Sequence, residues 1–311
     1  MSDPVLIGID WGSSSFRAFL VDARGAVLAR IATRDGVLAV PPGGFDATLV
    51  RLLGAWFEAH PRLPVLASGM VGSRQGWHEV AYFLCPVSPR ALAGALLPVL
   101  SSSGRIVNLV PGLCARDRRG LPDVLRGEEV QVVGALDEFP NARLLCLPGT
   151  HSKWVRIRAG IIESFTTFMT GELFAVLKDH SILGRLAVEA AEDEAAFSRG
   201  AEIGLAAEPE RGGTLRRLFF ARSLVLADEL APEAVASFLS GLLVGCEIRE
   251  ATGIVGAEDE VVLVGEPELC RRWERVLVLA GRSCAIASSE AAARGQLRLA
   301  RLAGLLGKGS A

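Results

Sequence analysis

The sequence predicts an α/β protein with two similar halves, and three observations carry this prediction. Apolar segments of strand length alternate with segments whose apolar residues recur at helical spacing. The chain has 311 residues, which is long for one compact core and suits two domains of ordinary size. A pattern of three short apolar runs joined by tight turns occurs twice, with its second copy about 137 positions after the first.

Composition and charge narrow the class of protein. Half of the residues are hydrophobic and 22% are charged, which is typical of a globular chain. The formal net charge is −2, and Lys and Arg are spread along the chain, so we expect no nucleic-acid partner. No apolar stretch is long enough to span a bilayer, and residues 1–4 lack the features of a signal peptide. We therefore expect a cytoplasmic protein without a membrane partner.

The six cysteines are scattered and include no Cys-x-x-Cys pair, and several lie inside apolar runs. This distribution predicts buried free thiols and not disulfides or metal ligands.

The first copy of the repeated pattern consists of the strand-like runs Val5–Ile9, Phe16–Val21 and Ala26–Ala32. Asp10 ends the first run, and Gly12 with three serines forms the turn to the second. Glycine lets the backbone approach a ligand closely, serines supply hydroxyl and N–H donors, and a carboxylate suits hydrated Mg²⁺. These are the parts of a phosphate-binding turn. The alternative is a surface hairpin in which the same residues serve only as turn formers.

A second candidate ligand site follows the next strand. Residues 45–59 have helical apolar spacing, and Val65–Ser68 reads as a short buried strand that leads into the loop 69–77. In open α/β sheets ligands bind beyond the carboxyl ends of strands, so this loop is a candidate site. Arg74 in the loop is suited to a carboxylate or a phosphate, and the alternative is a solvated arginine.

Residues 86–100 carry a helical pattern, residues 106–110 a strand pattern, and the segment after Pro111 reads as a loop with three arginines. Glu128 and Glu129 then open a mostly apolar helix. Acidic residues favour a first helical turn because of the helix dipole, so capping is one explanation. The buried character of the segment that both face favours a further role.

The second copy of the pattern comprises the apolar runs 144–147, 154–157 and 161–168, with the polar turn Pro148–Lys153 between the first two. Further helices are expected after Thr170, within 189–217, over 232–251 with Gly241 and Gly245 at close contacts, over 269–279 and over 291–306. Strands are expected over 260–264 and 284–287.

In this order, the hairpin 7–22, the acidic helix start, the second turn and the terminal strand, glycine and helix resemble the five motifs of the sugar kinase, Hsp70 and actin superfamily. Within it, four blocks resemble the 2-dehydro-3-deoxygalactonokinase family: Ser68–Trp77, Arg126–Gln131, Leu147–Trp154 and His180–Arg185. The resemblance runs through nearly the whole chain and is weakest over 189–217.

The resemblance implies an α/β fold of two RNase-H-like domains of the actin and hexokinase type, with mixed sheets and an interdomain cleft. Residues 1–125 would form an N-terminal domain with the first phosphate turn and the substrate loop. Residues 126–311 would form a C-terminal domain with the second phosphate turn and the adenosine site, its last helix near the domain interface. The implied activity is ATP-dependent phosphorylation of the 6-hydroxyl of 2-dehydro-3-deoxy-D-galactonate in galactonate catabolism, with Mg²⁺.

Phosphoryl transfer depends mainly on positioning and on charge neutralisation. The resemblance implies that Asp10 anchors the metal and that its turn holds phosphate through Gly12, Ser13 and Ser14. In the second turn the phosphate-binding candidates are Gly149, Thr150, Ser152 and Lys153. The superfamily usually has an Asp before those glycines, whereas this chain has Leu147, so Asp10 is expected to be the only clear protein ligand of the metal. His151 is either a phosphate donor or a packed side chain.

The remaining roles concern the base, the nucleoside and the sugar acid. A base must be a carboxylate within reach of the sugar hydroxyl, and we expect Glu129 in this role with Glu128 as the second choice. Adenine is expected near Gly265 and Glu266, where many relatives have two glycines. The expected substrate contacts are Arg17, Ser73, Arg74, Gln131, Thr170 and Glu172. Gly295 resembles the small residue that lets the last helix approach the domain interface, or is a tolerated helix glycine.

Two other interpretations stay open at this point. One is a kinase for a neighbouring substrate, such as 2-dehydro-3-deoxygluconate or an amino sugar. The other is a non-catalytic ATP-binding switch of the same fold, against which we note no peptide-binding appendage after Leu306 and no DNA-binding segment before Val5. Residue types specify neither the stereochemistry of the sugar acid nor metal preference nor oligomeric state, and a homodimer is left open.

Overall fold

The computed structural model describes residues 3–207, 212–256 and 259–306. Residues 1 and 2, which support the expectation of a cytoplasmic protein, lie outside the described residues. So do residues 208–211, which belong to the expected helical segment 189–217. Contacts divide the chain into two units. Unit 1 comprises the described residues of Met1–Ala142, Ile157–Phe165 and Ala287–Ala311, and unit 2 those of Arg143–Arg156 and Thr166–Ile286.

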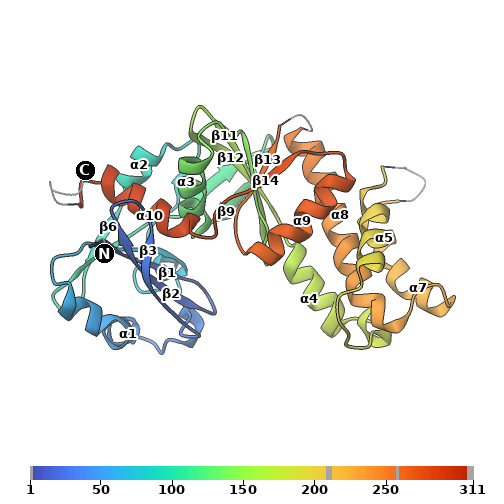
Figure 1. The fold of residues 1–311 in the computed structure, drawn as a ribbon, viewed down its shortest axis with the longest axis horizontal. Coiled ribbons are helices and arrows are strands. Elements are labelled where there is room, and N and C mark those ends of the chain that lie inside the picture. Colours follow the sequence, from blue (N-terminus) through green and yellow to red (C-terminus); the bar gives the residue numbers. More distant parts are fainter. Residues whose placement is uncertain (1–2, 208–211, 257–258, 307–311) are drawn as a thin grey trace. The chain divides into compact units, whose positions relative to one another are not determined.

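This division differs from the single boundary expected between residues 125 and 126. Helix α3 (Glu128–Glu138) and helix α10 (Ala291–Leu302) belong to unit 1 (Figure 1). The reason is their mutual packing. A Cβ atom at Gly295 would lie 1.8 Å from the Val130 carbonyl oxygen, and one at Gly134 would lie 1.8 Å from that of Ala291. Only glycine at both positions allows the two helices to lie this close, so Gly295 is a packing residue.

Unit 1 is built on a mixed sheet with the strand order β3-β2-β1-β4-β7-β6. Strands β1 to β3 form an antiparallel meander, β4 is parallel to β1, and β7 is parallel to β4. Helix α1 (Phe45–Ala59) has the expected bounds and packs Leu49 and Leu53 into a core with Ile7 and Ile9. The strands are β1 (Pro4–Trp11), β2 (Phe16–Asp22), β3 (Val27–Thr33), β4 (Val65–Gly69), β6 (Leu97–Leu100) and β7 (Ile106–Leu109).

Two predictions for the segment 86–125 were wrong. The expected helix over 86–100 is only the short α2 (Pro89–Ala93), which ends at Gly94, and β6 follows it as an edge strand beside β7. The expected loop after Pro111 contains β8 (Leu113–Arg116) and β9 (Pro122–Leu125), which form a small sheet with β5 (Phe83–Leu84). The Asp117 carboxylate accepts the Arg119 and Leu121 backbone N–H groups and so closes the β8–β9 turn.

A second large sheet, formed by strands of unit 2 together with residues 157–165 of unit 1, repeats the first five positions of the first sheet. Its strand order is β12-β11-β10-β13-β14, in which β10 is antiparallel to β11 and parallel to β13. The duplicated pattern is thereby confirmed, as is the predicted α/β class with mixed sheets. The strands are β10 (Leu144–Leu147), β11 (Ser152–Arg158), β12 (Ile161–Phe168), β13 (Val261–Leu263) and β14 (Cys284–Ile286).

Helices make up the rest of unit 2. Helix α8 crosses α5 so closely that a Cβ atom at Gly241 would lie 1.9 Å from the Phe197 carbonyl oxygen, which confirms the expected need for a small residue. The helices are α4 (Thr170–His180), α5 (Glu194–Leu205), α6 (Thr214–Leu218), α7 (Phe220–Leu226), α8 (Val235–Val255) and α9 (Pro267–Leu279).

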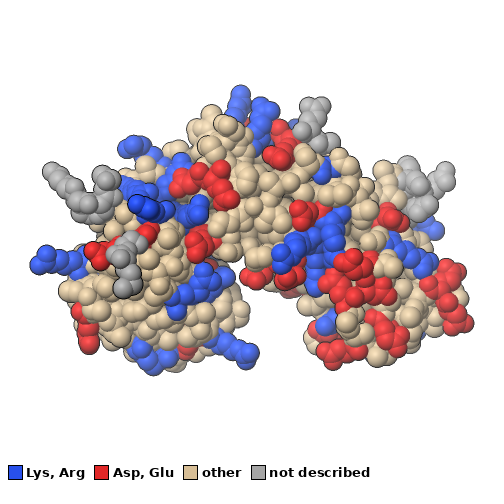
Figure 2. All heavy atoms as spheres, in the orientation of Figure 1, with Lys and Arg blue, Asp and Glu red and all other residues tan. Residues whose placement is uncertain are grey.

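All six cysteines are free thiols, but the prediction that they are buried holds for only three of them, Cys146, Cys246 and Cys270, while the other three are half-buried. Among the described residues no helix combines the length and the apolar character needed to cross a bilayer. Positively and negatively charged side chains are interspersed over the face seen in Figure 2.

Candidate functional site

Asp10 lies at the end of β1 with its side chain 11% exposed. Its Oδ2 forms an ion pair with Arg17 Nη2 at 2.7 Å. Burial raises the pKa of Asp10 above its ordinary value, and the Arg17 guanidinium opposes that rise. At the end of β4, Gly69 has a φ of +94°, and a Cβ atom there would lie 3.3 Å from Asp10 Oδ1 and 2.7 Å from the Trp11 carbonyl oxygen. Glycine at this position therefore allows the backbone to close over the carboxylate.

The donor set at Asp10 fits Mg²⁺. This ion is usually bound by one or two carboxylates and keeps several of its waters. Within residues 3–207, 212–256 and 259–306, no three His, Cys, Asp or Glu side chains gather into a metal-binding group. A metal held by Asp10 would take its other ligands from water and from phosphate oxygens.

The backbone of the first turn is held by its own segment and by the chain that follows β3. The Gly12 N–H donates to the Ser15 carbonyl at 2.9 Å, and the Gly12 and Ser13 carbonyls accept N–H groups of the 3-10 helix η1 (Val37–Ala39) and its start. Ser13 and Ser14 are exposed, and among the described residues their N–H groups have no acceptor. The turn thus offers two backbone donors beside a carboxylate, as a phosphate site requires.

The second turn has the same place at the end of the β10–β11 hairpin. Leu147 pairs with Lys153 in the register in which Asp10 pairs with Arg17. Lys153 is buried, and Ser152 is fully buried. The Gly149 and Thr150 N–H groups have no acceptor within the described part of the chain.

Helix α4 begins directly against the second turn. A Cβ atom at Gly171 would lie 2.5 Å from the Gly149 carbonyl oxygen, and the Glu172 N–H donates to the Thr150 carbonyl at 2.9 Å. The Glu172 carboxylate is hydrogen-bonded to His151 Nε2, and both side chains are about half exposed. The structure therefore brings Thr170 and Glu172, expected to contact sugar hydroxyls, to the second turn.

Beneath this turn lies a buried carboxyl group that the sequence did not reveal as part of the site. Glu247 Oε1 accepts the indole N–H groups of Trp154 at 2.8 Å and Trp273 at 2.9 Å. Burial raises the pKa of Glu247, and the Thr170 and Ser152 hydroxyls are near enough to oppose that rise. Neither Glu247 Oε2 nor Ser152 Oγ makes a hydrogen bond of normal geometry. The signal in the sequence was one acidic residue in the apolar run 235–248.

The two residues expected near adenine lie beside the second turn. Gly265 has a φ of +143°, and a Cβ atom there would lie 3.7 Å from the Pro148 carbonyl oxygen. Glu266 is exposed and precedes α9. Unit 2 thus gathers the second turn, the start of α4 and the start of α9 around Pro148.

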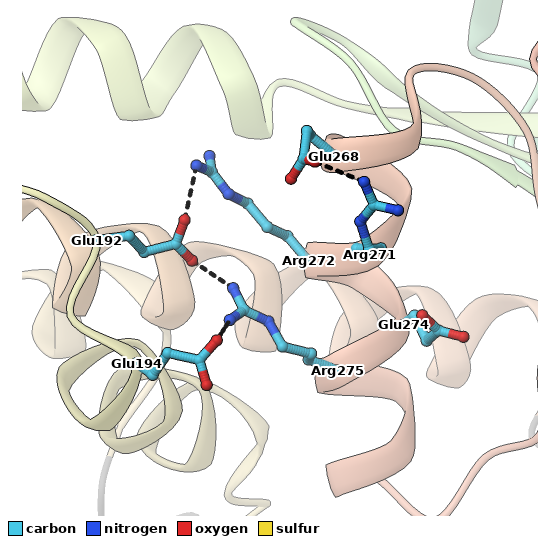
Figure 3. A pocket seen from close by; sticks show the side chains of 7 residues that line it. All are labelled: Glu192, Glu194, Glu268, Arg271, Arg272, Glu274 and Arg275. Carbon is cyan, nitrogen blue, oxygen red and sulfur yellow. Dashed lines mark hydrogen bonds and ion pairs between the residues drawn. The ribbon is translucent and has the colours of Figure 1, made fainter.

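A charged hollow of about 380 Å³ lies farther along α9 (Figure 3). Glu192, from the segment before α5, binds Arg272 at 3.0 Å and also binds Arg275, which reaches Glu194 as well. Arg271 binds Glu268 at 2.5 Å. Because these arginines are paired with carboxylates, the hollow offers little charge for an anion and serves to fasten the segment 192–194 to α9.

The two carboxylates at the start of α3 differ in their surroundings. Glu129 is fully buried, and its Oε2 accepts the Gly127 N–H at 2.6 Å while its Oε1 has no hydrogen-bond partner. Burial, and next to it the charge of Glu128, raises the pKa of Glu129 to about 8. Glu128 is half-buried, and its Oε2 accepts the Arg126 N–H at 3.0 Å.

The start of α3 also lies close to Asp10. A Cβ atom at Gly127 would lie 3.2 Å from the Gly69 Cα atom, and Gly69 in turn contacts Asp10. Unit 1 therefore places the metal-binding candidate Asp10 next to Gly69, which also adjoins Gly127, the residue whose N–H binds the Glu129 carboxyl.

The residues expected to contact the substrate from this loop and from α3 differ in their burial. Ser73 is buried, and its hydroxyl has no hydrogen-bond partner. The Arg74 side chain is 86% exposed and pairs with Glu79 at 3.4 Å. Gln131 is half-buried one helical turn after Glu128. Of these three, Ser73 alone presents an unused buried polar atom.

Comparison with known proteins adds the family. Residues 10–299 match the family described as 2-keto-3-deoxy-galactonokinase. A probable 2-dehydro-3-deoxygalactonokinase of Rhizobium meliloti is 37% identical over 94% of this chain and 95% of its own length. The 2-dehydro-3-deoxygalactonokinase of Escherichia coli is 33% identical over 88% of this chain and 90% of its own.

A crystal structure of a similar protein has the same fold as this chain. It belongs to a 2-dehydro-3-deoxygalactonokinase candidate from Sinorhizobium meliloti, which is 36% identical and superposes with a TM-score of 0.86 over 95% of this chain and 98% of that one. The expected actin and hexokinase type of fold is confirmed.

Proposed function

Because the chain belongs to the 2-keto-3-deoxy-galactonokinase family and is a sugar kinase, we propose that it transfers the terminal phosphoryl group of ATP to the 6-hydroxyl of 2-dehydro-3-deoxy-D-galactonate. The observation that carries the proposal is in unit 1. There Gly69 lies next to Asp10 and next to Gly127, whose N–H binds the buried carboxyl of Glu129. One carboxyl suits proton transfer and the other a metal.

Glu129 is the proposed general base. Its Oε2 is held by the Gly127 N–H, which leaves Oε1 for the proton of the sugar hydroxyl. A base works best when its pKa lies near the working pH, and the pKa of Glu129, about 8, meets that condition. Glu128 is the second choice, because its side chain is only half-buried, whereas that of Glu129 is fully buried.

Asp10 is the proposed anchor of Mg²⁺. When bound, Mg²⁺ neutralises charge on the phosphates of ATP. Arg17 holds the Asp10 carboxylate in place and supplies a positive charge beside it.

The two turns are proposed as phosphate sites in their own units. In unit 1 the donors are the N–H groups and hydroxyls of Ser13 and Ser14, next to Gly12. In unit 2 they are the N–H groups of Gly149 and Thr150, with the Lys153 ammonium and the Ser152 hydroxyl. The adenosine is proposed to lie by Gly265 and Glu266, which adjoin the second turn.

The proposed contacts to the sugar acid are Ser73, Gln131, Thr170 and Glu172. Ser73 has the best support, because its hydroxyl is buried without a partner. Thr170 and Glu172 have a second use at the second turn, so their contact with sugar hydroxyls depends on the sugar reaching that turn.

A coupled ADP-release assay tests the substrate. The panel consists of 2-keto-3-deoxy acids, aldonic acids and neutral sugars. We expect the highest kcat/KM with 2-dehydro-3-deoxy-D-galactonate. A higher kcat/KM with a neutral sugar would contradict the proposal. It would also be contradicted if the protein binds ATP but phosphorylates no member of the panel.

The pH dependence of the same assay tests the base. Glu129 must lose its proton to act, so log kcat/KM should rise by about one per pH unit below about pH 8 and level off above it. Glu129→Gln should lose this rise and about 10²- to 10⁴-fold in kcat while still binding ATP. Glu128→Gln is the matched control. If it is the inactive variant, Glu128 is the base.

A further inference from the structure

Arg126, which directly follows β9, is a buried cation; its charge opposes the rise that burial causes in the pKa of Glu129, but the two side chains form no hydrogen bond or ion pair. It is 9% exposed, and no ion pair of the described residues includes it. Its guanidinium makes one hydrogen bond, from Nη2 to the Val80 carbonyl oxygen at 2.7 Å. Nε and Nη1 are buried and have no partner. An arginine keeps its proton in proteins, and a buried charge is costly unless it is paired, so an anion is missing here.

The unused side of Arg126 faces the substrate loop. A Cβ atom at Gly72 would lie 3.0 Å from Arg126 Nη1, so the guanidinium contacts the backbone that directly precedes Ser73. The Ser73 hydroxyl is a buried donor without a partner. Arg126 is also three residues before Glu129, whose Oε1 is likewise buried and has no hydrogen-bond partner.

We propose that Arg126, with the Ser73 hydroxyl beside it, binds the carboxylate of the sugar acid. This inference rests on the proposed function. It assigns the carboxylate of the sugar acid to Arg126 and not to Arg74. The comparison of the two arginines decides the choice. Arg74 is exposed and has Glu79 as its partner, whereas Arg126 is buried and has none. A carboxylate gains more binding free energy from a buried guanidinium than from an exposed arginine that already has an acidic partner.

Tyr82 covers the site. The Arg126 Cζ atom lies 4.4 Å from the centre of the Tyr82 ring, and a Cβ atom at Gly112 would lie 2.9 Å from the edge of that ring. Tyr82 itself is 45% exposed, and its ring lies between the buried guanidinium and the solvent. A carboxylate reaches the buried nitrogens only when Tyr82 or its loop shifts. Binding of the sugar acid must therefore change the surroundings of Tyr82.

Tyr82 is the one tyrosine of the sequence, which gives a direct test. Protein labelled with 3-fluorotyrosine has a single ¹⁹F resonance. Without ATP, titration with 2-dehydro-3-deoxy-D-galactonate should move this resonance saturably, and D-galactose, which lacks a carboxylate, should leave it in place. A wild-type resonance that does not move with the sugar acid overturns the inference.

Kinetics of variants give the second arm. Arg126→Lys keeps the charge but not the planar donor group, and Arg126→Met removes both. Each should raise KM for the sugar acid about tenfold or more, with KM for ATP within about twofold. The matched control is Arg118→Met in the exposed β8–β9 turn, which should behave as wild type. A loss of substrate binding with Arg74→Met, but not with the Arg126 variants, returns the carboxylate to Arg74 and overturns the inference.

A folding defect in one variant can be distinguished from a loss of substrate binding. If Arg126→Met fails to fold, Arg126→Lys and Gly72→Ala decide, since the new methyl group displaces Nη1 while the arginine stays. Folded variants with the KM of the wild type overturn the role of Arg126. This failure is distinct from failure of the proposed function, in which the wild type itself would not phosphorylate the sugar acid.

Discussion

The turns of the two units lie at matching places in two copies of one sheet, yet they carry different charges. By strand register, Leu147 stands where Asp10 stands, and Lys153 where Arg17 stands. Each copy also has a glycine of positive φ at the end of the neighbouring parallel strand, Gly69 in one and Gly265 in the other. Both turns have backbone N–H groups without an acceptor among the described residues, but only the first turn has a carboxylate.

The supports behind the turns differ as well. The first turn rests on η1, and its carboxylate is balanced by Arg17. The second rests on the start of α4, with the buried Glu247 below it. A backbone cradle for phosphate can therefore be repeated with quite different side chains, whereas metal binding depends on a single acidic position. The predictions below test this division of labour.

Among changes in the two turns, the largest effect is expected from Asp10→Asn. The amide keeps the size of the side chain but removes its charge, and with it the metal anchor and the ion pair to Arg17. We expect kcat/KM to fall about 10²- to 10³-fold, the range seen when one electrostatic group that stabilises a transition state is removed. Steady-state kinetics over a range of Mg²⁺ concentrations should show the loss, with thermal unfolding as the check on folding.

The comparison breaks if a single change in the second turn costs more than Asp10→Asn. In that case the carboxylate would not be the distinguishing feature of the first turn, and the metal would have to be held elsewhere.

A smaller effect is expected from Lys153→Met. Methionine keeps an unbranched side chain in this buried position but cannot donate to a phosphate. We expect KM for ATP to rise about tenfold, with KM for the sugar acid within about twofold. An increase in KM for the sugar acid alone would place Lys153 in the sugar site.

The sequence allowed the local features to be predicted and left the long-range ones open. The strands of both meanders follow from short apolar runs between turn residues, and α1 follows from its apolar spacing before Pro61 and Pro64. The small sheet of β8 and β9 was not predicted because each of these strands has only four residues and is partly exposed. The placement of α3 and α10 in unit 1 depends on helix contacts at Gly134 and Gly295, which no local pattern specifies.

The same limit applies to the site. Acidic residues at the start of α3 could be predicted, but the distinction between Glu128 and Glu129 depends on which carboxyl group is buried. Arg74 and Arg126 are equally visible in the sequence, and only their exposure and partners separate them. Residue type and spacing thus predict candidates, and desolvation selects among them.

The smallest effect is expected from His151→Gln, which tests the one side chain of the second turn whose role the sequence left open. His151 is bound to Glu172, and both are about half exposed, a type of pair that contributes about 1 kcal/mol or less. We expect KM for ATP to change by less than about fivefold. A larger rise would make His151 a phosphate donor and the second turn richer in charge than Lys153 alone. Glu172→Gln should match His151→Gln if the two residues act only through each other, and an additional rise in KM for the sugar acid would assign Glu172 a contact of its own.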